Sequence, residues 1–167
     1  MMRSGLPIEL AEATSQGGNA LFSLLSERLQ KDAGLLLVTV LVPDEDGMRL
    51  NRLHSTDEEN YPLGAADEVV DTAWFRQLFR SGKPVVANDD DEIASWLPGY
   101  TEYAAQGYGS LANLPINVAG RVIGIVNVMG TAGHFTPARL GLISSWLPLA
   151  ALAILAERTQ PAAVISS

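Results

Sequence analysis

Residues 110–129 read SLANLPINV, then AG, then RVIGIVNVM. Both long runs are rich in apolar and β-branched side chains, and the pair between them contains a glycine. Such a pattern is typical of two antiparallel strands joined by a two-residue turn. This hairpin is the strongest strand signal in the chain, and it predicts an antiparallel sheet.

Two amides, Asn113 and Asn127, interrupt the apolar character of these strands. With a regular two-residue turn between the strands, Asn113 stands opposite Val126. Asn127 then stands opposite Ala112. This register sends the two amides to opposite faces of the sheet, so at most one of them faces a pocket. The alternative is that each amide binds neighbouring loop backbone, as most buried polar side chains do.

Three further strands are expected. Residues 35–42 form a continuous apolar run before Pro43, which favours a central strand covered on both faces. Residues 48–55 alternate polar and apolar side chains after a turn, so they pair with the central strand as a hairpin. Residues 83–87 contain Pro84 and are expected at a sheet edge, where a missing N–H is tolerated.

Helical periodicity appears in three segments. The N-terminal helix spans about residues 8–32, with either a break at Gly17-Gly18 or a true start near Asn19, because adjacent glycines disfavour a helix interior. A short helix spans residues 72–81. The C-terminal helix spans about residues 137–158, begins at a proline and is expected to kink at its second proline.

The order of these elements predicts an α+β fold. A central antiparallel sheet of about five or six strands is sandwiched between the long terminal helices and the short middle helices and loops. We expect residues 1–159 to form one domain. Residues 160–167 show no pattern and are expected to form a flexible tail.

The composition excludes several classes of function. The chain has 167 residues, 19 acidic against 11 basic side chains, and no cysteine. A net charge of −8 argues against binding to nucleic acid or to an anionic membrane, because both need clustered Lys and Arg. Without cysteine there is no disulfide, thiolate nucleophile or Cys-ligated metal centre. The apolar stretch 147–156 is too short to span a bilayer, so we expect a cytoplasmic protein.

The C-terminal helix is apolar nearly all round, while 17 of the 19 acidic residues lie in residues 1–92. A helix that is apolar on every side must be buried on every side. One face can cover the sheet, and the other requires a partner. We therefore expect a homodimer formed through the terminal helices.

Six short sequence motifs follow one another along the chain. They are LHS at 53–55, YPLG at 61–64, TAW at 72–74, SGKP at 81–84, GSLANLPI at 109–116 and GRVIG at 120–124, followed by Asn127. Their order and spacing resemble the GAF domain, a sensory module with a central antiparallel sheet between helical layers. The resemblance covers about residues 21–155.

The resemblance implies a small-molecule pocket between the sheet and the segments that cover it, and dimerisation through the terminal helices. GAF domains bind cyclic nucleotides, bilins, haem or small metabolites, and usually report to an output domain. A covalent bilin and the sulfoxide-reductase activity of some GAF proteins both depend on cysteine, which is absent here. The Asn-Lys-X-Phe-Asp-Glu string of phosphodiesterase GAF domains is also missing. We therefore expect no cofactor, only a small metabolite of unknown identity.

Five residues are the expected ligand contacts, namely Arg52, Tyr61, Trp74, Tyr108 and Asn113. The aromatic side chains combine an apolar body with a polar tip, and a guanidinium can hold a carboxylate or phosphate with two hydrogen bonds. Alternation places Arg52 on the same side of its strand as Leu50 and His54. The alternative for Arg52 is an ion pair with an acid of residues 57–59. Three more aromatic residues of the covering segments are weaker candidates: Trp96, Tyr100 and Tyr103.

Metal-dependent and catalytic functions are disfavoured. His54 and His134 are the only histidines, and their spacing matches no metal motif. A haem would need only one of them, and the alternative is an exposed or packed imidazole. The acidic run 89–92 lacks the pattern of a calcium loop and suits a helix N-terminus. No nucleophile motif is present.

The sequence therefore predicts a non-catalytic sensory domain that binds a small molecule and acts as a homodimer. The alternative is a structural or interaction module with a vestigial pocket, which docks to a separate output protein.

Overall fold

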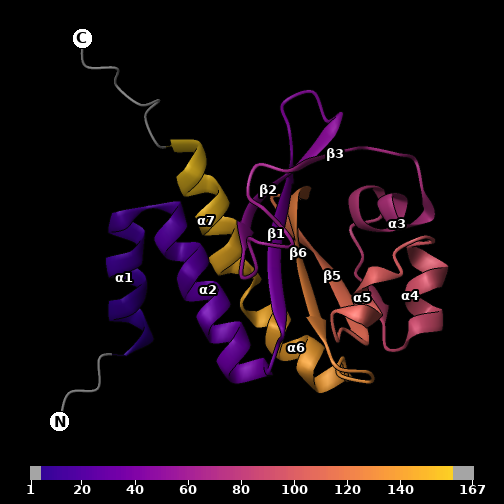
Figure 1. Cartoon of the computed structure of the whole chain (residues 1–167). Coiled ribbons are helices and arrows are strands. Elements are labelled where there is room, and N and C mark those ends of the chain that lie inside the picture. Colours follow the sequence, from indigo (N-terminus) through magenta and orange to yellow (C-terminus); the bar gives the residue numbers. More distant parts are fainter. Residues whose placement is uncertain (1–4, 160–167) are drawn as a thin grey trace.

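The computed structural model describes residues 5–159. Its six strands form one sheet, and helices lie on both sides of it (Figure 1). The strand order is β3-β2-β1-β6-β5-β4, and every neighbouring pair is antiparallel. The strands are β1 Leu37–Pro43, β2 Arg49–Ser55, β3 Ala66–Glu68, β4 Val85–Ala87, β5 Ser110–Val118 and β6 Arg121–Gly130. The predicted α+β class and strand number are confirmed. The expected tail, residues 160–167, lies outside the described residues.

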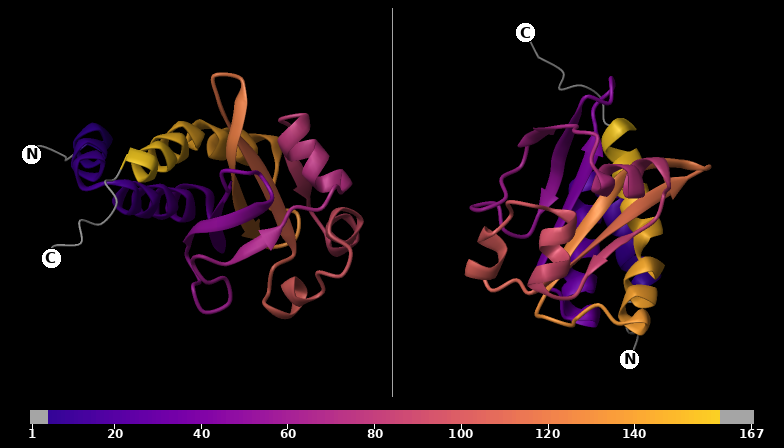
Figure 2. Two further views of the ribbon diagram at one scale, coloured as in Figure 1. Left: turned by 90° about the horizontal axis from the view of Figure 1, so that it is seen from above. Right: turned by 90° about the vertical axis from the view of Figure 1, so that its right-hand side faces the viewer.

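Two groups of helices cover the two faces of the sheet (Figure 2). On one face lie α2 Gly18–Ala33, α6 Pro137–Ser145 and α7 Leu147–Thr159, and α1 Leu6–Gln16 packs outside α2. The other face is covered by α3 Ala73–Phe75, the π-helical turn η1 Arg76–Arg80, α4 Asp90–Trp96 and α5 Glu102–Ala105. The sheet is therefore sandwiched between terminal and middle helices.

β1 lies in the middle of the sheet, and its alternate residues face the two layers. Val38 and Val40 are fully buried in the core beneath the terminal helices. Leu37 and Leu41 belong to the apolar clusters of the other face. Both sides of the strand are covered, which explains its continuous apolar sequence.

Both terminal helical regions are broken, each for a local reason. Gly17 separates α1 from α2 with φ at 115°, a backbone conformation that favours glycine. The C-terminal region breaks at Trp146 and not at Pro148, where the kink was expected. Pro148 stands in the first turn of α7, where its missing N–H costs no helical hydrogen bond.

One helical region of the described chain, Pro137–Thr159, is long and apolar enough to cross a membrane by length and composition alone. The core helix of a soluble protein passes the same test, so the observation is weak. Here α7 packs against α2 and buries part of its apolar surface, at Leu149, Ala150, Ala153 and Ile154.

A bulge in β2 separates Arg52 from His54. Consecutive residues of β1, Val40 and Leu41, pair with His54 and Arg52, so Leu53 is an extra residue in β2. An extra residue reverses the alternation of side chains. The prediction that Arg52 and His54 share one face is therefore wrong. Arg52 faces the middle helices, whereas His54 stacks on a residue of α2.

A second bulge lies in the hairpin of β5 and β6. The predicted turn at residues 119–120 is present, but Ile123 is an extra residue on β6. Beyond it the register shifts by one residue, and Asn113 stands directly opposite Asn127. The prediction that the two amides face opposite sides is wrong, because it assumed an unbroken register.

His54 is packed between β2 and α2. Its ring stacks on Phe22 with 5.5 Å between centroids, and its Nε2 contacts Ser26 Oγ. The Ser26 hydroxyl donates to the carbonyl oxygen of Phe22 at 3.0 Å. Burial lowers the pKa of His54, because desolvation disfavours the charged imidazolium.

Gly124 in β6 lets α7 lie close to the sheet. A Cβ at this position would lie 2.8 Å from the carbonyl oxygen of Leu41 and 3.0 Å from Ile154 Cδ1. Gly141 in α6 is the opposite case, since nothing lies within 4 Å of a Cβ built there.

We predict opposite effects from two glycine substitutions. Gly124→Ala should lower the free energy of unfolding by about 1–3 kcal/mol, because a strand backbone and α7 must both move. Gly141→Ala should raise it by up to about 1 kcal/mol, because alanine favours a helix interior. Urea denaturation measures both values. A neutral Gly124→Ala would show that α7 does not pack closely on β6.

Acidification should destabilise the protein through His54. Below the ordinary histidine pKa of 6.5 the unfolded chain gains a proton there, while the folded protein resists it. The stability supplied by neutral His54 is thus complete above about pH 6.5 and is lost as the pH falls toward the lower folded pKa. Urea denaturation across this range should show a smaller loss for His54→Gln, whose amide cannot titrate. Equal losses in the two proteins would contradict the assignment.

Candidate functional site

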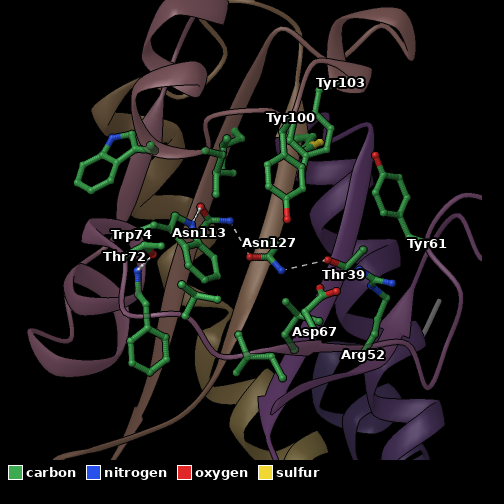
Figure 3. Close-up of a pocket in the computed structure, with 18 of the residues that line it drawn as sticks. Thr39, Arg52, Tyr61, Asp67, Thr72, Trp74, Tyr100, Tyr103, Asn113 and Asn127 are labelled. Atoms are coloured by element: carbon green, nitrogen blue, oxygen red, sulfur yellow. Dashed lines mark hydrogen bonds between the residues drawn. The ribbon is translucent and has the colours of Figure 1, made fainter. Parts of the chain in front are cut away.

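A cavity of about 530 Å³ lies between the sheet and the short elements on its second face (Figure 3). Side chains of β1, β5 and β6 form its floor. β2, β3, Tyr61 and the segments 69–75 and 96–103 supply its walls. Its volume falls within the range of about 300–1,000 Å³ that is typical of small-molecule sites.

Four polar side chains form a hydrogen-bonded chain across the floor (Figure 3). Trp74 Nε1 donates to Asn113 Oδ1 at 2.9 Å. Asn113 Nδ2 donates to Asn127 Oδ1 at 2.6 Å, and Asn127 Nδ2 donates to Thr39 Oγ1 at 3.2 Å. The chain therefore crosses from α3 over β5 and β6 to β1.

The hydrogen bonds of this chain of side chains all run in one direction, from Trp74 to Thr39. An indole N–H can only donate, so Trp74 sets the orientation of the Asn113 amide and, through it, that of Asn127. The chain ends on the oxygen of Thr39, which accepts a hydrogen bond and still carries its own proton. That hydroxyl has no acceptor among the described residues, so it is free to donate into the cavity.

Arg52 lies at the same end of the cavity as Thr39 (Figure 3). Its Nη1 donates to the carbonyl oxygen of Pro62 at 3.2 Å, and its guanidinium lies 5.6 Å from the ring centroid of Tyr61. Its Nε is buried and has no hydrogen-bond partner among the described residues. Asp57 of the neighbouring loop accepts hydrogen bonds from Asn60 instead of pairing with Arg52, and these bonds lower its pKa.

Tyrosines tie the covering segments together. Tyr61 Oη donates to Gln106 Oε1 at 2.5 Å, which joins the loop after β2 to the end of α5. Tyr100 and Tyr103 stack with 5.5 Å between ring centroids. Burial raises the pKa of Tyr61 to about 12 and also raises that of Tyr103. Both phenols are therefore neutral hydrogen-bonding groups near pH 7.

The structure brings together four of the five expected ligand contacts, since Arg52, Tyr61, Trp74 and Asn113 all line the cavity. Tyr108 is not among the lining residues and is buried in an adjacent apolar cluster. The weaker aromatic candidates also line the cavity, namely Trp96, Tyr100 and Tyr103.

Six polar residues that line the cavity were not among the expected contacts, namely Thr39, Asp67, Glu68, Thr72, Glu102 and Asn127. We expected Asn127 on the opposite face of the sheet from Asn113, because the expected register had no bulge. Thr39 carries a visible signal, because it is the only polar residue in the apolar run 35–42. Asp67 carries none, since a short acidic stretch is also what a solvated loop looks like.

Neither histidine lines the cavity. His54 lies on the opposite face of the sheet, and His134 Nε2 contacts a backbone carbonyl oxygen at 2.7 Å. Asp89, in the acidic run, caps α4 by accepting from the backbone N–H of Glu92 at 2.8 Å. Within residues 5–159, no group of three His, Asp or Glu side chains is placed to hold a metal ion.

Several solved structures share this fold. The GAF domain region of a putative membrane protein from Geobacter sulfurreducens PCA has 22% identity and a TM-score of 0.66, over 88% of this chain and 99% of that one. The GAF domain of an Acinetobacter phosphoenolpyruvate-protein phosphotransferase has 15% identity and a TM-score of 0.63, over 96% and 99%. The second GAF domain of DevS from Mycobacterium smegmatis has 20% identity and a TM-score of 0.60, over 84% and 96%.

At these identities the structures establish the fold alone, and no curated protein matches the chain. The family itself is established by sequence. The family model of the GAF domain matches residues 19–155, a span that contains the whole sheet and every residue that lines the cavity. The resemblance seen in the short strings is thereby confirmed, and the chain belongs to the GAF domain family.

Proposed function

We propose that this protein is a non-catalytic, cytoplasmic sensory domain that binds a small metabolite reversibly in the 530 Å³ cavity. GAF domains generally act in sensing and signalling rather than in catalysis. The hydrogen-bonded chain from Trp74 to Thr39 carries the proposal, because it lies on the floor of a mainly apolar and aromatic cavity. A few converging polar groups in apolar surroundings are the usual construction of a small-molecule site.

The side chains of the cavity favour binding over catalysis. A hydroxyl nucleophile needs a base within hydrogen-bond reach. Neither threonine hydroxyl of the cavity donates to a base among the described residues, where Thr39 accepts from an amide and Thr72 accepts from the backbone N–H of Phe75. The contact of Ser26 with His54 lies on the opposite face of the sheet, where Ser26 is buried and donates to backbone.

We further infer that two copies associate through their terminal helices. The core side of α7 is buried, while the other side carries an apolar stripe of Ala151 and Leu152, which are half-buried, and Leu155, which is exposed. Leu155 is 39% exposed, and Leu142 of α6 is 40% exposed. A second copy would cover both helices with the same surface, as a two-fold dimer requires.

A thermal-shift screen of nucleotides, amino acids and purine-derived metabolites should find a stabilising compound. A ligand that binds only the folded state raises the free energy of unfolding by about 2.7 kcal/mol at about 100 times its Kd. Native mass spectrometry of freshly purified protein should also detect a retained small molecule. A screen without any shift, together with an empty protein in the spectrometer, would favour the module that docks to a separate output protein.

Asn113→Leu should abolish the ligand-induced shift, because it interrupts the polar chain on both sides. It also leaves Trp74 Nε1 and Asn127 Oδ1 unpaired, which should cost about 1–3 kcal/mol of stability. Asn88→Ala is the matched control, since Asn88 binds the backbone of Phe135 at 3.2 and 2.9 Å outside the cavity. This variant should lose comparable stability and keep the shift. Loss of the shift in both variants would contradict a specific role for the chain.

Light scattering coupled to gel filtration should give a mass of twice 17.8 kDa at micromolar concentration. Leu155→Glu should give a monomer, because it places a charge in the apolar stripe. Met48→Glu is the control, since Met48 is 65% exposed in the turn between β1 and β2. A monomeric wild-type protein would refute the dimer.

A further inference from the structure

The cavity has a charged end that its size and floor do not explain. Arg52 of β2, Thr39 of β1 and Asp67 of β3 come together there from three neighbouring strands (Figure 3). The opposite end, around Trp74, is aromatic. A ligand that fits the cavity must therefore carry its charge at one end.

Two donors at this end lack a partner within residues 5–159. One is the Nη2 group of Arg52, which forms no hydrogen bond with these residues, and the other is the hydroxyl of Thr39. Arg52 Nε is also unpaired, but protein atoms enclose it and a ligand does not reach it. The guanidinium is already held in place by the carbonyl oxygen of Pro62 and the ring of Tyr61. A carboxylate has enough lone pairs to accept from both of these donors, and its hydrogen bond with a guanidinium is charge-assisted. This pair of donors calls for a carboxylate on the ligand.

Acidic side chains also line the cavity, namely Asp67, Glu68 and Glu102. None of them forms an ion pair with Arg52 in the described part of the chain. One guanidinium among three carboxylates disfavours a ligand with several negative charges, such as a nucleotide. Asp67 pairs with Leu50 in the sheet, two residues from Arg52 along β2, and both charged residues line the cavity (Figure 3). The carboxylate of Asp67 therefore suits a positively charged group on the same ligand.

The rest of the lining suits an uncharged body. Indole, phenyl and aliphatic side chains face the space between floor and cover, among them Trp74, Phe75, Trp96, Leu111 and Met129. An apolar or aromatic group of the ligand would gain by leaving water there.

We propose that the cavity takes an α-amino acid with an apolar or aromatic side chain. Its carboxylate accepts from Arg52 and Thr39, its ammonium group lies beside Asp67, and its side chain points toward Trp74. This inference rests on the proposed function and names the class of ligand for the same site. A plain carboxylic acid would leave Asp67 facing a second negative charge, and a plain amine would leave Arg52 unpaired.

Calorimetric titration of the unmodified protein with L-leucine, L-methionine, L-phenylalanine and L-tryptophan should detect binding of at least one. For L-phenylalanine the matched probes are 3-phenylpropionate, which lacks the ammonium group, and 2-phenylethylamine, which lacks the carboxylate. The corresponding pair is used for any other amino acid that binds. We expect the amino acid to bind about tenfold to a hundredfold more tightly than either probe, because each probe loses one charge-assisted contact.

Two variants assign the two ends of the ligand. Arg52→Gln should weaken the amino acid about tenfold or more and leave the amine nearly unchanged. Asp67→Asn should bring the plain carboxylic acid close to the amino acid in affinity. Arg49→Gln is the control, because Arg49 is exposed on the same strand and does not line the cavity.

The outcomes separate this inference from the proposed function. Binding of neutral or nucleotide compounds without any amino acid would overturn the amino-acid class and leave the sensory domain standing. Equal affinities for the amino acid and its desamino acid would overturn the role of Asp67. If no compound of any class binds, both proposals fall.

Discussion

The pairing of Asn113 with Asn127 is the contact on which the second face of the sheet depends. It exists because Ile123 is an extra residue in β6, which shifts the register of the β5–β6 hairpin. In an unbroken hairpin one of the two amides would lie beneath α2 and α7, in a core without polar partners. An amide buried without a hydrogen-bond partner costs several kcal/mol. The hydrogen-bonded chain from Trp74 to Thr39 therefore depends on the bulge, which places both amides on the same face of the sheet.

The two faces of the sheet therefore differ in the polarity of the side chains that they bury. The core under the terminal helices is mainly apolar and includes many residues that are fully buried, among them Leu21, Phe22, Leu25 and Ile154. Polar side chains on the other face are tolerated because they bind one another, from Trp74 to Thr39. Stability is thus concentrated on one side, and the other side is free to hold an incompletely filled, partly polar space.

Sequence reasoning located the elements whose signals are local. The hairpin turn at residues 119–120, the edge strand with Pro84 and the short helical segment that begins after Thr72 all follow from residues within a few positions of the feature. The two bulges had no such signal, because Leu53 and Ile123 are ordinary strand residues. A slip of one residue then misplaced His54 and Asn127, since each side chain follows the register of its strand.

The candidate site shows the same limit. Trp74 and Asn113 were found because an aromatic or amide side chain stood out in a telling context. Tyr108 stood out equally and lies in a core cluster, because an aromatic residue satisfies a core and a cavity alike. Arg52 was placed near the pocket, but the position of its guanidinium depends on contacts with Pro62 and Tyr61, which only the folded loop supplies.

β1 joins the two faces through consecutive residues. Thr39 ends the polar chain in the cavity, while Val38 and Val40 on either side of it are packed in the core with residues of α2. The cavity and the helical layer are therefore separated by the thickness of a single backbone. A ligand that shifts the backbone of β1 would also shift Val38 and Val40. The movement would reach the terminal helices through these side chains, without any further element between them. Because such coupling is reciprocal, a partner that holds the terminal helices in one position would also raise or lower the affinity of the cavity for its ligand.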